Sequence, residues 1–305
     1  MNKAVWQKEL QGFVKTSVLI NEPMKKHTTW NIGGPADFMV FPSSEEELIG
    51  ILQFLHSEDS IPFVMGNGSN ILVGDKGIRG VVIRLAGAFS KRTWRGNEVD
   101  AQAGALLPSL ALEAAERSLT GMEFAAGIPG SFGGAIRMNA GAYGNTIGEY
   151  VTKVGLTEYS GTKRELTVDE LTFEYRKSNL FSADGIVTSV TLKFLEGDRE
   201  QSMAKIKELL QLRIRKQPLE FPSCGSVFRN PVNDHAGRLI EMANLRGTQI
   251  GGAMVSRKHG NFIINLGGAK AKDVLNLIEA VQRRVEDSYG VHLETEVKLV
   301  GEFER

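Results

Sequence analysis

Residues 61–73 read IPFVMGNGSNILV and place the loop GNGSN, residues 66–70, between two apolar segments. The two glycines of this loop permit positive φ and leave consecutive backbone N–H groups uncovered by side chains. Such N–H groups form concavities that bind anions, notably phosphate oxygens. Asn-Gly is also a common pair in tight hairpin turns. Taken alone, the loop is therefore compatible with a hairpin turn or with a phosphate-binding loop.

A second glycine-rich segment reads GIPGSFGG over residues 127–134 and continues through MNAGAYG over residues 138–144. It carries few charges, which indicates that it lies against a surface or is buried. It is either a structural crossing loop packed on its own domain or a ligand-binding loop. Two such loops in one chain favour ligand binding more strongly than one loop does.

The remaining sequence predicts helices and strands with short connections, which is typical of an α+β or mixed α/β protein. Ser44 and Glu47 have the spacing of a capping box, and Gly290 is placed to end a helix. Apolar periodicity predicts helices over residues 3–15, 44–56, 107–119, 198–216, 235–245 and 273–289. Strands are predicted over residues 36–41, 61–65, 81–85, 98–103, 151–159, 186–194 and 295–303.

Composition narrows the function classes. Lys+Arg and Asp+Glu each number 36 in 305 residues, so the formal net charge is zero, which argues against a nonspecific nucleic-acid binder. Cys224 is the only cysteine, so intrachain disulfides are excluded. The first residues lack an apolar signal core and no apolar run reaches about 18 residues, so we expect a cytoplasmic protein without a membrane partner. The P-loop, GxGxxG and HExxH motifs are all missing from the sequence.

Several segments together resemble one enzyme family. They occur in the order GNGSNILV, AGIPGSFGGAIRMNAGAYG, FEYRKSNLF, PSCGSVFRNP, AGRLIE, GGAMVSRKHGNFIIN and LETEVKLVG, between Thr28 and Gly301. This set resembles the UDP-N-acetylenolpyruvoylglucosamine reductases. One subtype of that family carries an additional tyrosine loop that covers the substrate. No such segment is seen here, so the chain resembles the shorter subtype.

The resemblance implies an α+β fold. The expected architecture is the two-domain FAD-binding fold of the vanillyl-alcohol oxidase (PCMH-type) group, followed by a C-terminal α/β substrate-binding domain. Residues 1–80 would form the first FAD-binding subdomain, to which residues 291–305 return. Residues 81–205 would form the second subdomain, and residues 206–290 the substrate-binding domain.

The resemblance also implies the reaction. The enolpyruvyl ether of UDP-N-acetylglucosamine enolpyruvate would be reduced to UDP-N-acetylmuramate, a peptidoglycan precursor, with NADPH as co-substrate. NADPH and the nucleotide sugar would use the same cleft in turn, and the enzyme would be a monomer. FAD would be held noncovalently by residues of both glycine-rich loops, namely Gly66, Asn67, Gly68, Ser69, Asn70, Gly127, Ile128, Pro129, Gly130, Ser131, Gly133 and Gly134.

Three residues match the family's catalytic positions: Arg176, Ser226 and Glu296. Arg176 would bind the substrate carboxylate, because its fork of donors suits a carboxylate. Ser226 would donate a proton, and Glu296 would lie beside the substrate carboxylate. From the residues alone, the favoured interpretation of Arg176 is a surface arginine in a basic loop, and Glu296 is compatible with a surface ion pair with Lys298.

Two further ambiguities remain around the proton donor. Ser223 and Ser226 cannot be separated from the sequence alone, and either is also a common turn residue. The neighbouring Cys224 is a further nucleophile by type, although a lone cysteine is usually an inert, small apolar residue unless its pKa is lowered.

Other positions match the family more weakly. Tyr143, Arg229 and Asn230 fall where the family contacts the diphosphate and sugar, and His259 falls near the nucleotide. Arg137 departs from the family, in which an aromatic or aliphatic residue is expected.

Two alternatives stay open. The first is an FAD-dependent oxidase of the same fold, which often tethers its flavin through His or Cys. The second is a noncatalytic protein that binds nucleotide sugars.

Overall fold

The computed structural model describes residues 3–304 and divides the chain into two compact units. The first unit comprises residues up to Ile20, Phe38–Asn67 and Gly80–Gln211. The second unit comprises Asn21–Asp37, Gly68–Arg79 and the residues from Leu212 onward. Each unit is therefore assembled from segments that are far apart in the sequence.

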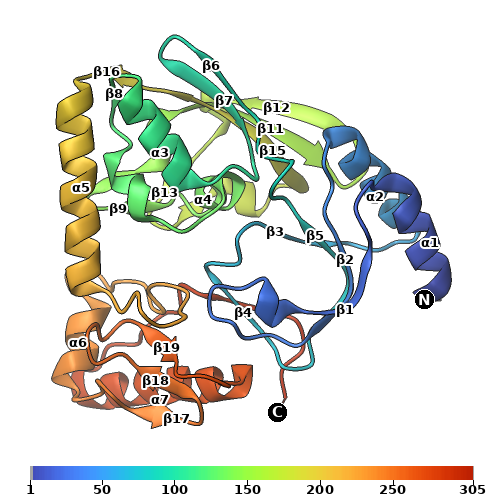
Figure 1. Ribbon diagram of the computed structural model, residues 1–305. Coiled ribbons are helices and arrows are strands. Elements are labelled where there is room, and N and C mark those ends of the chain that lie inside the picture. Colours follow the sequence, from blue (N-terminus) through green and yellow to red (C-terminus); the bar gives the residue numbers. More distant parts are fainter. Residues whose placement is uncertain (1–2, 305) are drawn as a thin grey trace. The chain divides into compact units, whose positions relative to one another are not determined.

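A five-stranded antiparallel sheet dominates the first unit, with strand order β12-β11-β15-β7-β6 (Figure 1). The short helix α4 packs against β7 and β15 of this sheet and buries Phe132 and Ile136. The sheet strands are β6 (Arg92–Arg95), β7 (Glu98–Gln102), β11 (Val151–Glu158), β12 (Lys163–Thr167) and β15 (Gly185–Lys193). The helices are α1 (Lys3–Phe13), α2 (Glu45–Ser57), α3 (Leu107–Glu116), α4 (Phe132–Arg137) and α5 (Arg199–Lys216), and the chain enters the second unit within α5.

Shorter elements of the first unit connect the sheet to these helices. The strands are β3 (Phe63–Met65), β8 (Leu119–Thr120), β9 (Gly141–Ala142), β10 (Asn145–Thr146), β13 (Phe173–Glu174), β14 (Lys177–Ser178) and β16 (Leu195–Glu196). The 3-10 turns are η2 (Glu123–Gly127), η3 (Ile147–Tyr150), η4 (Val168–Glu170) and η5 (Asn179–Phe181). The pairs β9–β10 and β13–β14 are hairpins with two-residue loops.

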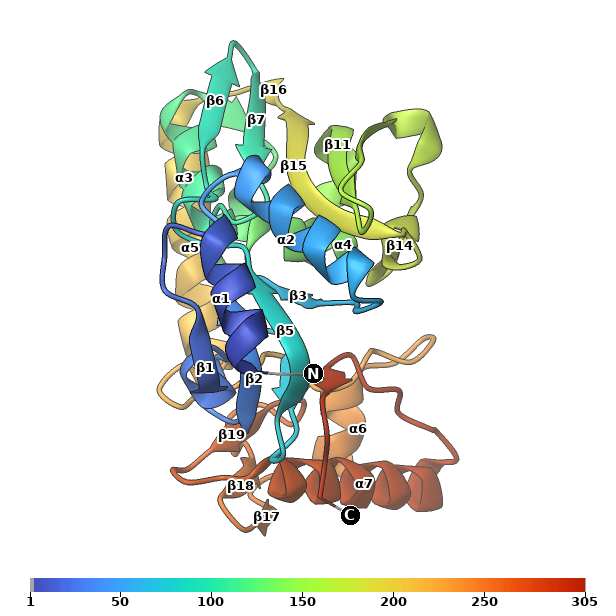
Figure 2. The ribbon, with the colours of Figure 1, turned by 90° about the vertical axis from the view of Figure 1, so that its right-hand side faces the viewer.

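Helices α1 and α2 pack side by side (Figure 2). The indole of Trp6 meets the ring of Phe54 edge-on, with the ring centroids 5.3 Å apart. At the start of α2, the Ser44 hydroxyl accepts a hydrogen bond from the Glu47 amide at 3.3 Å. The Glu47 carboxylate bonds the amide and hydroxyl of Ser43 instead of returning to Ser44. The first hydrogen bond of the predicted capping box is therefore present, whereas the Glu47 carboxylate bonds Ser43 in place of the Ser44 amide.

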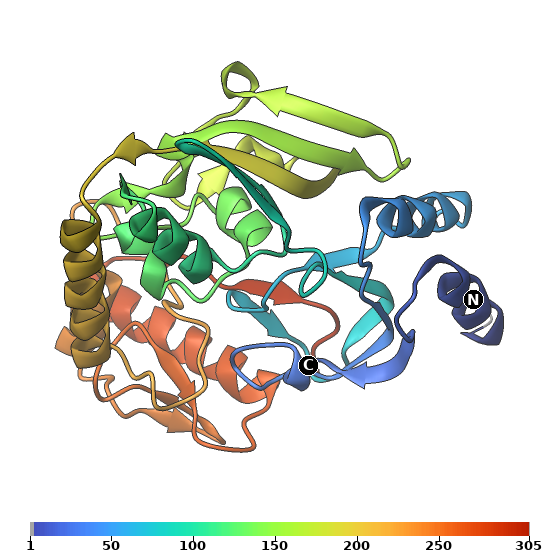
Figure 3. The ribbon, with the colours of Figure 1, turned by 45° about the horizontal axis from the view of Figure 1, so that its top comes forward.

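The second unit has its core around α7 (Ala271–Tyr289), a long helix in the orange-red part of the chain in Figure 3. The apolar face of α7 buries Val274, Leu277, Val281 and Val285 at helical spacing. Helix α6 and two strands of a small sheet, β17 and β18, pack against α7. The elements of this unit are η1 (Met24–Lys26), β4 (Ile71–Val73), α6 (Ala236–Met242), β17 (Gln249–Ile250), β18 (Ala253–Val255), β19 (Ile263–Asn265) and β20 (Lys298–Val300). Three strands contain residues of both units, namely β1 (Leu19–Pro23), β2 (Pro35–Val40) and β5 (Ile78–Arg84), and they belong to a sheet of order β1-β2-β5-β3.

The α+β class and the long helices are confirmed, with ends that shift by a few residues. Gly290 ends α7 in the left-handed conformation, as predicted. The last predicted strand, 295–303, contracts to β20, which pairs in parallel with β4. The sequence analysis missed β6, β12 and the sheet β17–β19. The predicted glycine-rich stretch contains α4 and the hairpin β9–β10.

The first turn of α7 is capped by a carboxylate from a distant part of the chain. The two oxygens of Asp75 accept the amide N–H groups of Ala271 and Lys272, each at 2.9 Å. These amides have no partner within the helix, and a negative charge near the N-terminal end of a helix is stabilising. We expect Asp75→Ala to lower the free energy of unfolding in urea by about 1–2 kcal/mol. The control Asp287→Ala, on the exposed last turns of α7, should change it by less than about 0.5 kcal/mol; equal losses would contradict the cap.

Candidate active site

The two glycine-rich loops touch within the first unit. A Cβ atom at Gly66 would lie 1.7 Å from the Ser131 hydroxyl oxygen and 2.6 Å from its Cβ. The side chain of Asn67 donates a hydrogen bond to the Pro129 carbonyl at 2.9 Å. Only glycine fits at position 66, so the absence of a side chain there sets the distance between the loops.

The hairpin interpretation of residues 66–70 is wrong. Strand β3, before the loop, pairs in parallel with β5, and β4, after the loop, pairs with β20. Gly68 has a φ of +63°, and a Cβ there would lie 2.2 Å from the His27 carbonyl oxygen. Within residues 3–304, no backbone or side-chain acceptor takes the amides of residues 66–69. The loop therefore presents donors that a bound anion can use.

The second loop offers fewer free amides. The amides of Phe132 and Gly133 donate to the carbonyls of Ala105 and Ala103 at 2.7 and 2.8 Å. The amide of Gly130 donates to the Ile128 carbonyl at 2.8 Å. These bonds fix the start of α4 beside the end of β7. The second loop acts mainly as a wall, while the first loop supplies most of the open donors.

Arg176 lies at the tip of the hairpin β13–β14, where Tyr175 and Arg176 form the two-residue loop. Its φ is +56°, in the left-handed region that L side chains rarely adopt. This conformation costs about 1–2 kcal/mol for a residue other than glycine. The guanidinium carbon lies 5.1 Å from the centroid of the Tyr175 ring. A strained arginine at an exposed tip is a feature of functional sites.

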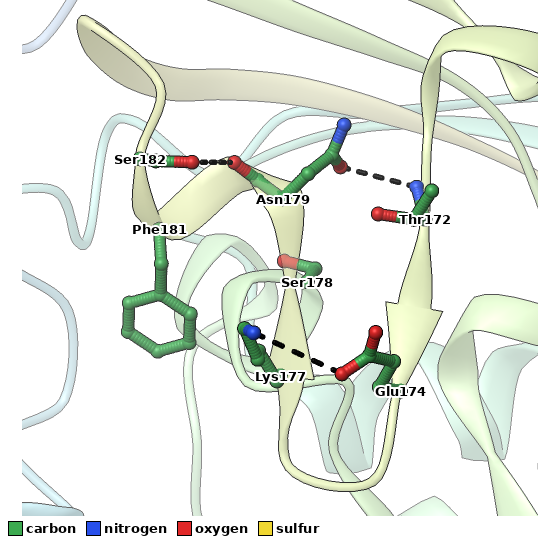
Figure 4. Close-up of a pocket in the computed structure, with 7 residues that line it drawn as sticks. All are labelled: Thr172, Glu174, Lys177, Ser178, Asn179, Phe181 and Ser182. Carbon is green, nitrogen blue, oxygen red and sulfur yellow. Dashed lines mark hydrogen bonds and ion pairs between the residues drawn. The ribbon is translucent and has the colours of Figure 1, made fainter.

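A pocket lies beside this hairpin (Figure 4). Asn179 joins its two sides, because its side-chain oxygen accepts the Thr172 amide at 3.1 Å. Glu174 and Lys177 form an exposed ion pair at 3.8 Å, which contributes little to stability. The pocket is lined by Thr172, Glu174, Lys177, Ser178, Asn179, Phe181 and Ser182.

Tyr143 occupies a second strained tip in the first unit. It forms the loop of the hairpin β9–β10 with Gly144, and both residues have positive φ, at +55° and +86°. The Tyr143 hydroxyl donates to the Leu209 carbonyl of α5 at 3.3 Å. Its ring remains 47% exposed, so it is available to a ligand.

Ser226 and Glu296 lie on neighbouring extended segments of the second unit. The Glu296 amide donates to the Val227 carbonyl at 2.8 Å, and Phe228 forms a bridge with Thr295. The Glu296 carbonyl accepts the side-chain amide of Asn70 at 3.2 Å. The structure thus brings together two of the predicted catalytic residues and ties them to the first glycine-rich loop.

The same segment contains Ser223 and Cys224, the neighbours of Ser226. The Ser223 backbone carbonyl accepts the hydroxyl of Thr29, a turn residue, at 2.7 Å, and this bond does not involve the Ser223 hydroxyl. Burial, and to a smaller extent the charge of Glu296, raises the pKa of the Cys224 thiol. A buried thiol with a raised pKa stays protonated and is a poor nucleophile. Cys224 is therefore a core residue, and its charge interaction places the Glu296 carboxylate close to it.

The weaker candidates of the second unit differ in their surroundings. Arg229 lies 3.9 Å from Glu294, and its buried Nε atom has no hydrogen-bond partner within the described residues 3–304. The side-chain oxygen of Asn230 accepts the Ala236 amide at 3.1 Å. His259 accepts the Asn261 amide on Nδ1 at 3.1 Å, and burial lowers its pKa. At neutral pH its ring is therefore uncharged and carries its proton on Nε2.

The first unit holds Gly66, Asn67, the second loop, Tyr143 and Arg176, and the second unit holds the rest of the predicted residues. Asn139 and Ser178 lie in segments that carry the family resemblance, but the sequence analysis gave neither residue a role. Both are buried: the Asn139 side chain donates to the Glu174 carbonyl, and the Ser178 hydroxyl donates to the Arg137 carbonyl. No group of His, Cys, Asp or Glu that could hold a metal occurs within the part of the chain that the structure describes. In that same part, none of the helices is long and apolar enough to span a bilayer.

Comparison with known proteins gives a consistent result. The family profile "UDP-N-acetylenolpyruvoylglucosamine reductase, C-terminal domain" matches residues 217–300, and the profile "FAD binding domain" matches residues 36–167. A UDP-N-acetylenolpyruvoylglucosamine reductase from Caldanaerobacter subterraneus subsp. tengcongensis is 47% identical over 93% of each chain. A protein of the same name from Carboxydothermus hydrogenoformans is 44% identical over 99% of this chain and 100% of its own.

A solved structure agrees with these matches. The crystal structure of UDP-N-acetylenolpyruvylglucosamine reductase from Thermus caldophilus is 39% identical, with a TM-score of 0.79 over 93% of this chain and 98% of that chain. The predicted fold class, an FAD-binding fold with an additional C-terminal domain, is confirmed.

The contact between the two loops can be tested by adding one methyl group. We expect Gly66→Ala to weaken FAD binding to the apoprotein at least about tenfold, because the new Cβ displaces Ser131 and the first loop with it. Fluorescence titration with FAD measures the affinity. Gly12→Ala is the control, since a Cβ at Gly12 in α1 meets nothing within 4 Å. Unchanged FAD affinity in Gly66→Ala would show that the loop spacing is not critical.

Proposed function

Because the chain belongs to the UDP-N-acetylenolpyruvoylglucosamine reductase family, we propose that Arg176, Ser226 and Glu296 carry its chemistry. The reaction is the reduction of UDP-N-acetylglucosamine enolpyruvate to UDP-N-acetylmuramate, with NADPH as the reductant. The enzyme is a flavoprotein of peptidoglycan precursor synthesis. The hydrogen bond from the Glu296 amide to the Val227 carbonyl is the observation that supports the assignment, because it holds the segments that carry Glu296 and Ser226 side by side.

The residues present fit FAD. The first glycine-rich loop has free amides and two positions at which a side chain would collide with backbone or with Ser131. We assign the phosphate groups of FAD to this loop, and we assign the second loop, with Pro129 and Ser131, to the wall beside it. When bound, FAD supplies the hydride-carrying chemistry that links NADPH to the enolpyruvyl group. All cofactor contacts proposed are noncovalent.

Arg176 is proposed to bind the carboxylate of the enolpyruvyl group. Its planar guanidinium can make two parallel hydrogen bonds to a carboxylate. Negative charge develops next to this carboxylate as hydride reaches the terminal carbon of the double bond. A fixed cation stabilises the additional charge of the transition state more than it stabilises the single charge of the ground-state carboxylate, which lowers the barrier. The left-handed conformation of Arg176 supports a role at the tip of the hairpin.

Ser226 is proposed to donate the proton that the second carbon of the double bond requires. A serine hydroxyl is a weak acid, so its proton transfer must coincide with the build-up of charge on that carbon. Ser226 follows Gly225, which has a φ of +83°, and precedes Val227, whose amide and carbonyl are both hydrogen-bonded. The backbone on the C-terminal side of the hydroxyl is therefore fixed.

Glu296 is proposed to contact the same substrate carboxylate. An anion next to a carboxyl group favours its protonated form, which can donate a hydrogen bond. The Glu296 amide donates to the Val227 carbonyl and the Glu296 carbonyl accepts from the side chain of Asn70, so the backbone that carries this carboxyl group is fixed within the second unit.

The remaining assignments concern binding and organisation. We assign Tyr143, Arg229 and Asn230 to the diphosphate and sugar, and His259 to the nucleotide. The three-part division at residues 80, 205 and 290 is kept as a proposal for how the functional domains are arranged. We also propose a monomer that acts in the cytoplasm without a nucleic-acid or membrane partner, in line with its zero net charge and water-soluble substrates.

The role of Ser226 can be separated from that of Ser223 with two alanine variants. We expect Ser226→Ala to leave flavin reduction by NADPH unchanged and to slow flavin reoxidation by the enolpyruvyl substrate about a thousandfold, the range typical of a lost proton donor. Stopped-flow absorbance under anaerobic conditions follows both phases. Ser223→Ala is the matched control and should leave both phases unchanged. A slow reoxidation in Ser223→Ala with a normal rate in Ser226→Ala would reverse the assignment.

A further inference from the structure

We infer that Ser178 and Asn139 are positioning residues that hold Arg176 in place for the substrate carboxylate. This inference rests on the proposed role of Arg176. Both residues lie in the first unit and are buried, with exposures of 2% for Ser178 and 4% for Asn139. Neither belongs to the proposed catalytic set. The hydrogen bond of Ser178 anchors β14 to the end of α4, and that of Asn139 anchors β13 to the residues just after α4.

The hairpin needs support from outside. Strands β13 and β14 have two residues each, so few ladder hydrogen bonds hold them together. An isolated two-stranded hairpin is only marginally stable even when it is longer. The φ of +56° at Arg176 adds a further cost at the tip. Such a tip keeps one conformation only when the surrounding structure imposes it.

The segment at the end of α4 supplies this support on both strands. On β14, the Ser178 hydroxyl donates to the Arg137 carbonyl at 2.8 Å. On β13, the Asn139 side-chain nitrogen donates to the Glu174 carbonyl at 2.9 Å. The Asn139 side-chain oxygen accepts the Gly148 amide at 3.0 Å, which fixes the orientation of the amide group. The two bonds flank Arg176 at equal distances along the chain, two residues before it and two after it.

Arg137 makes the supporting segment rigid. Its guanidinium donates to the Phe181 carbonyl at 3.2 Å and lies 5.4 Å from the centroid of the Phe181 ring. The Nε atom of Arg137 is buried without a hydrogen-bond partner among the described residues 3–304, and this burial lowers the pKa of the group. The residue that departs from the family pattern therefore packs on the turn that follows β14.

Ser182 provides a matched comparison in the same region. Its hydroxyl donates to the Asn179 carbonyl at 3.0 Å, three residues back, and makes no bond to α4 (Figure 4). Removing it deletes a hydroxyl from the same pocket without touching the support of the hairpin. Ser178 and Ser182 thus differ in the partner of their hydroxyl group, which is the end of α4 for Ser178 and the local turn for Ser182.

The test measures ligand binding to the FAD-loaded protein by calorimetry. UDP-N-acetylmuramate carries the carboxylate that Arg176 would bind, and UDP-N-acetylglucosamine lacks it. We expect Ser178→Ala to weaken UDP-N-acetylmuramate about tenfold, as expected for one lost hydrogen bond, and to leave UDP-N-acetylglucosamine unchanged. Ser178→Thr, which keeps the hydroxyl, should restore the affinity, and Ser182→Ala should change neither ligand.

A double-mutant cycle separates positioning from general structural damage. If Ser178 acts through Arg176, Ser178→Ala has no further effect on UDP-N-acetylmuramate binding when Arg176 is already alanine. An equal loss for both ligands, or a loss that persists in the Arg176→Ala background, overturns the inference. Asn139→Asp keeps the acceptor for Gly148 and loses the donor to Glu174. It is assayed in the same way, and decides the matter if Ser178→Ala does not fold.

The outcomes also distinguish the inference from the function on which it rests. If Arg176→Ala itself leaves UDP-N-acetylmuramate affinity unchanged, the proposed role of Arg176 fails. If Arg176→Ala weakens this ligand and neither Ser178→Ala nor Asn139→Asp does, Arg176 keeps its role and the inference fails.

Discussion

The rest of the site depends on the missing side chain at Gly66. Because no Cβ is present, the first glycine-rich loop can approach Ser131, and any larger residue would push the two loops apart. Ser131 directly precedes α4, whose first amides are bonded to the end of β7. The positions of Gly66 and Asn67 are thus tied to the central sheet of the first unit. The proposed phosphate-binding role of the loop rests on this approach and on its amides.

Helix α4 lies between the contact with the first loop and the hairpin that carries Arg176. Its beginning carries the contact with the first loop, and its end, together with Asn139, bonds both strands of the hairpin that presents Arg176. One short element therefore links the proposed cofactor contacts to the proposed carboxylate contact. In the second unit, the hydrogen bond from the Glu296 amide to the Val227 carbonyl holds the segments of the proposed residues Ser226 and Glu296 side by side.

The helices and the first glycine-rich loop could be predicted from the sequence, whereas several strand pairings and backbone conformations could not, for physical reasons. Periodicity found the helices because each buries one face, and glycine spacing found the first loop. The partners of that loop could not be predicted, because β4 pairs with β20 from the far end of the chain. The choice between Ser223 and Ser226 has no signal in the sequence, because both are serines of the same short loop segment, and it stays a prediction. Nothing in the sequence indicated the left-handed conformation of Arg176, since arginine rarely adopts positive φ.

The central claim is that this chain passes electrons from NADPH to an enolpyruvyl nucleotide sugar through bound flavin. The most direct test is an anaerobic absorbance titration of the FAD-loaded protein, first with NADPH and then with UDP-N-acetylglucosamine enolpyruvate. The flavin absorbance should fall on adding NADPH and return on adding the enolpyruvyl compound. Absorbance that returns only when oxygen is admitted would indicate an oxidase. A protein that does not bind FAD at all would contradict both enzyme assignments.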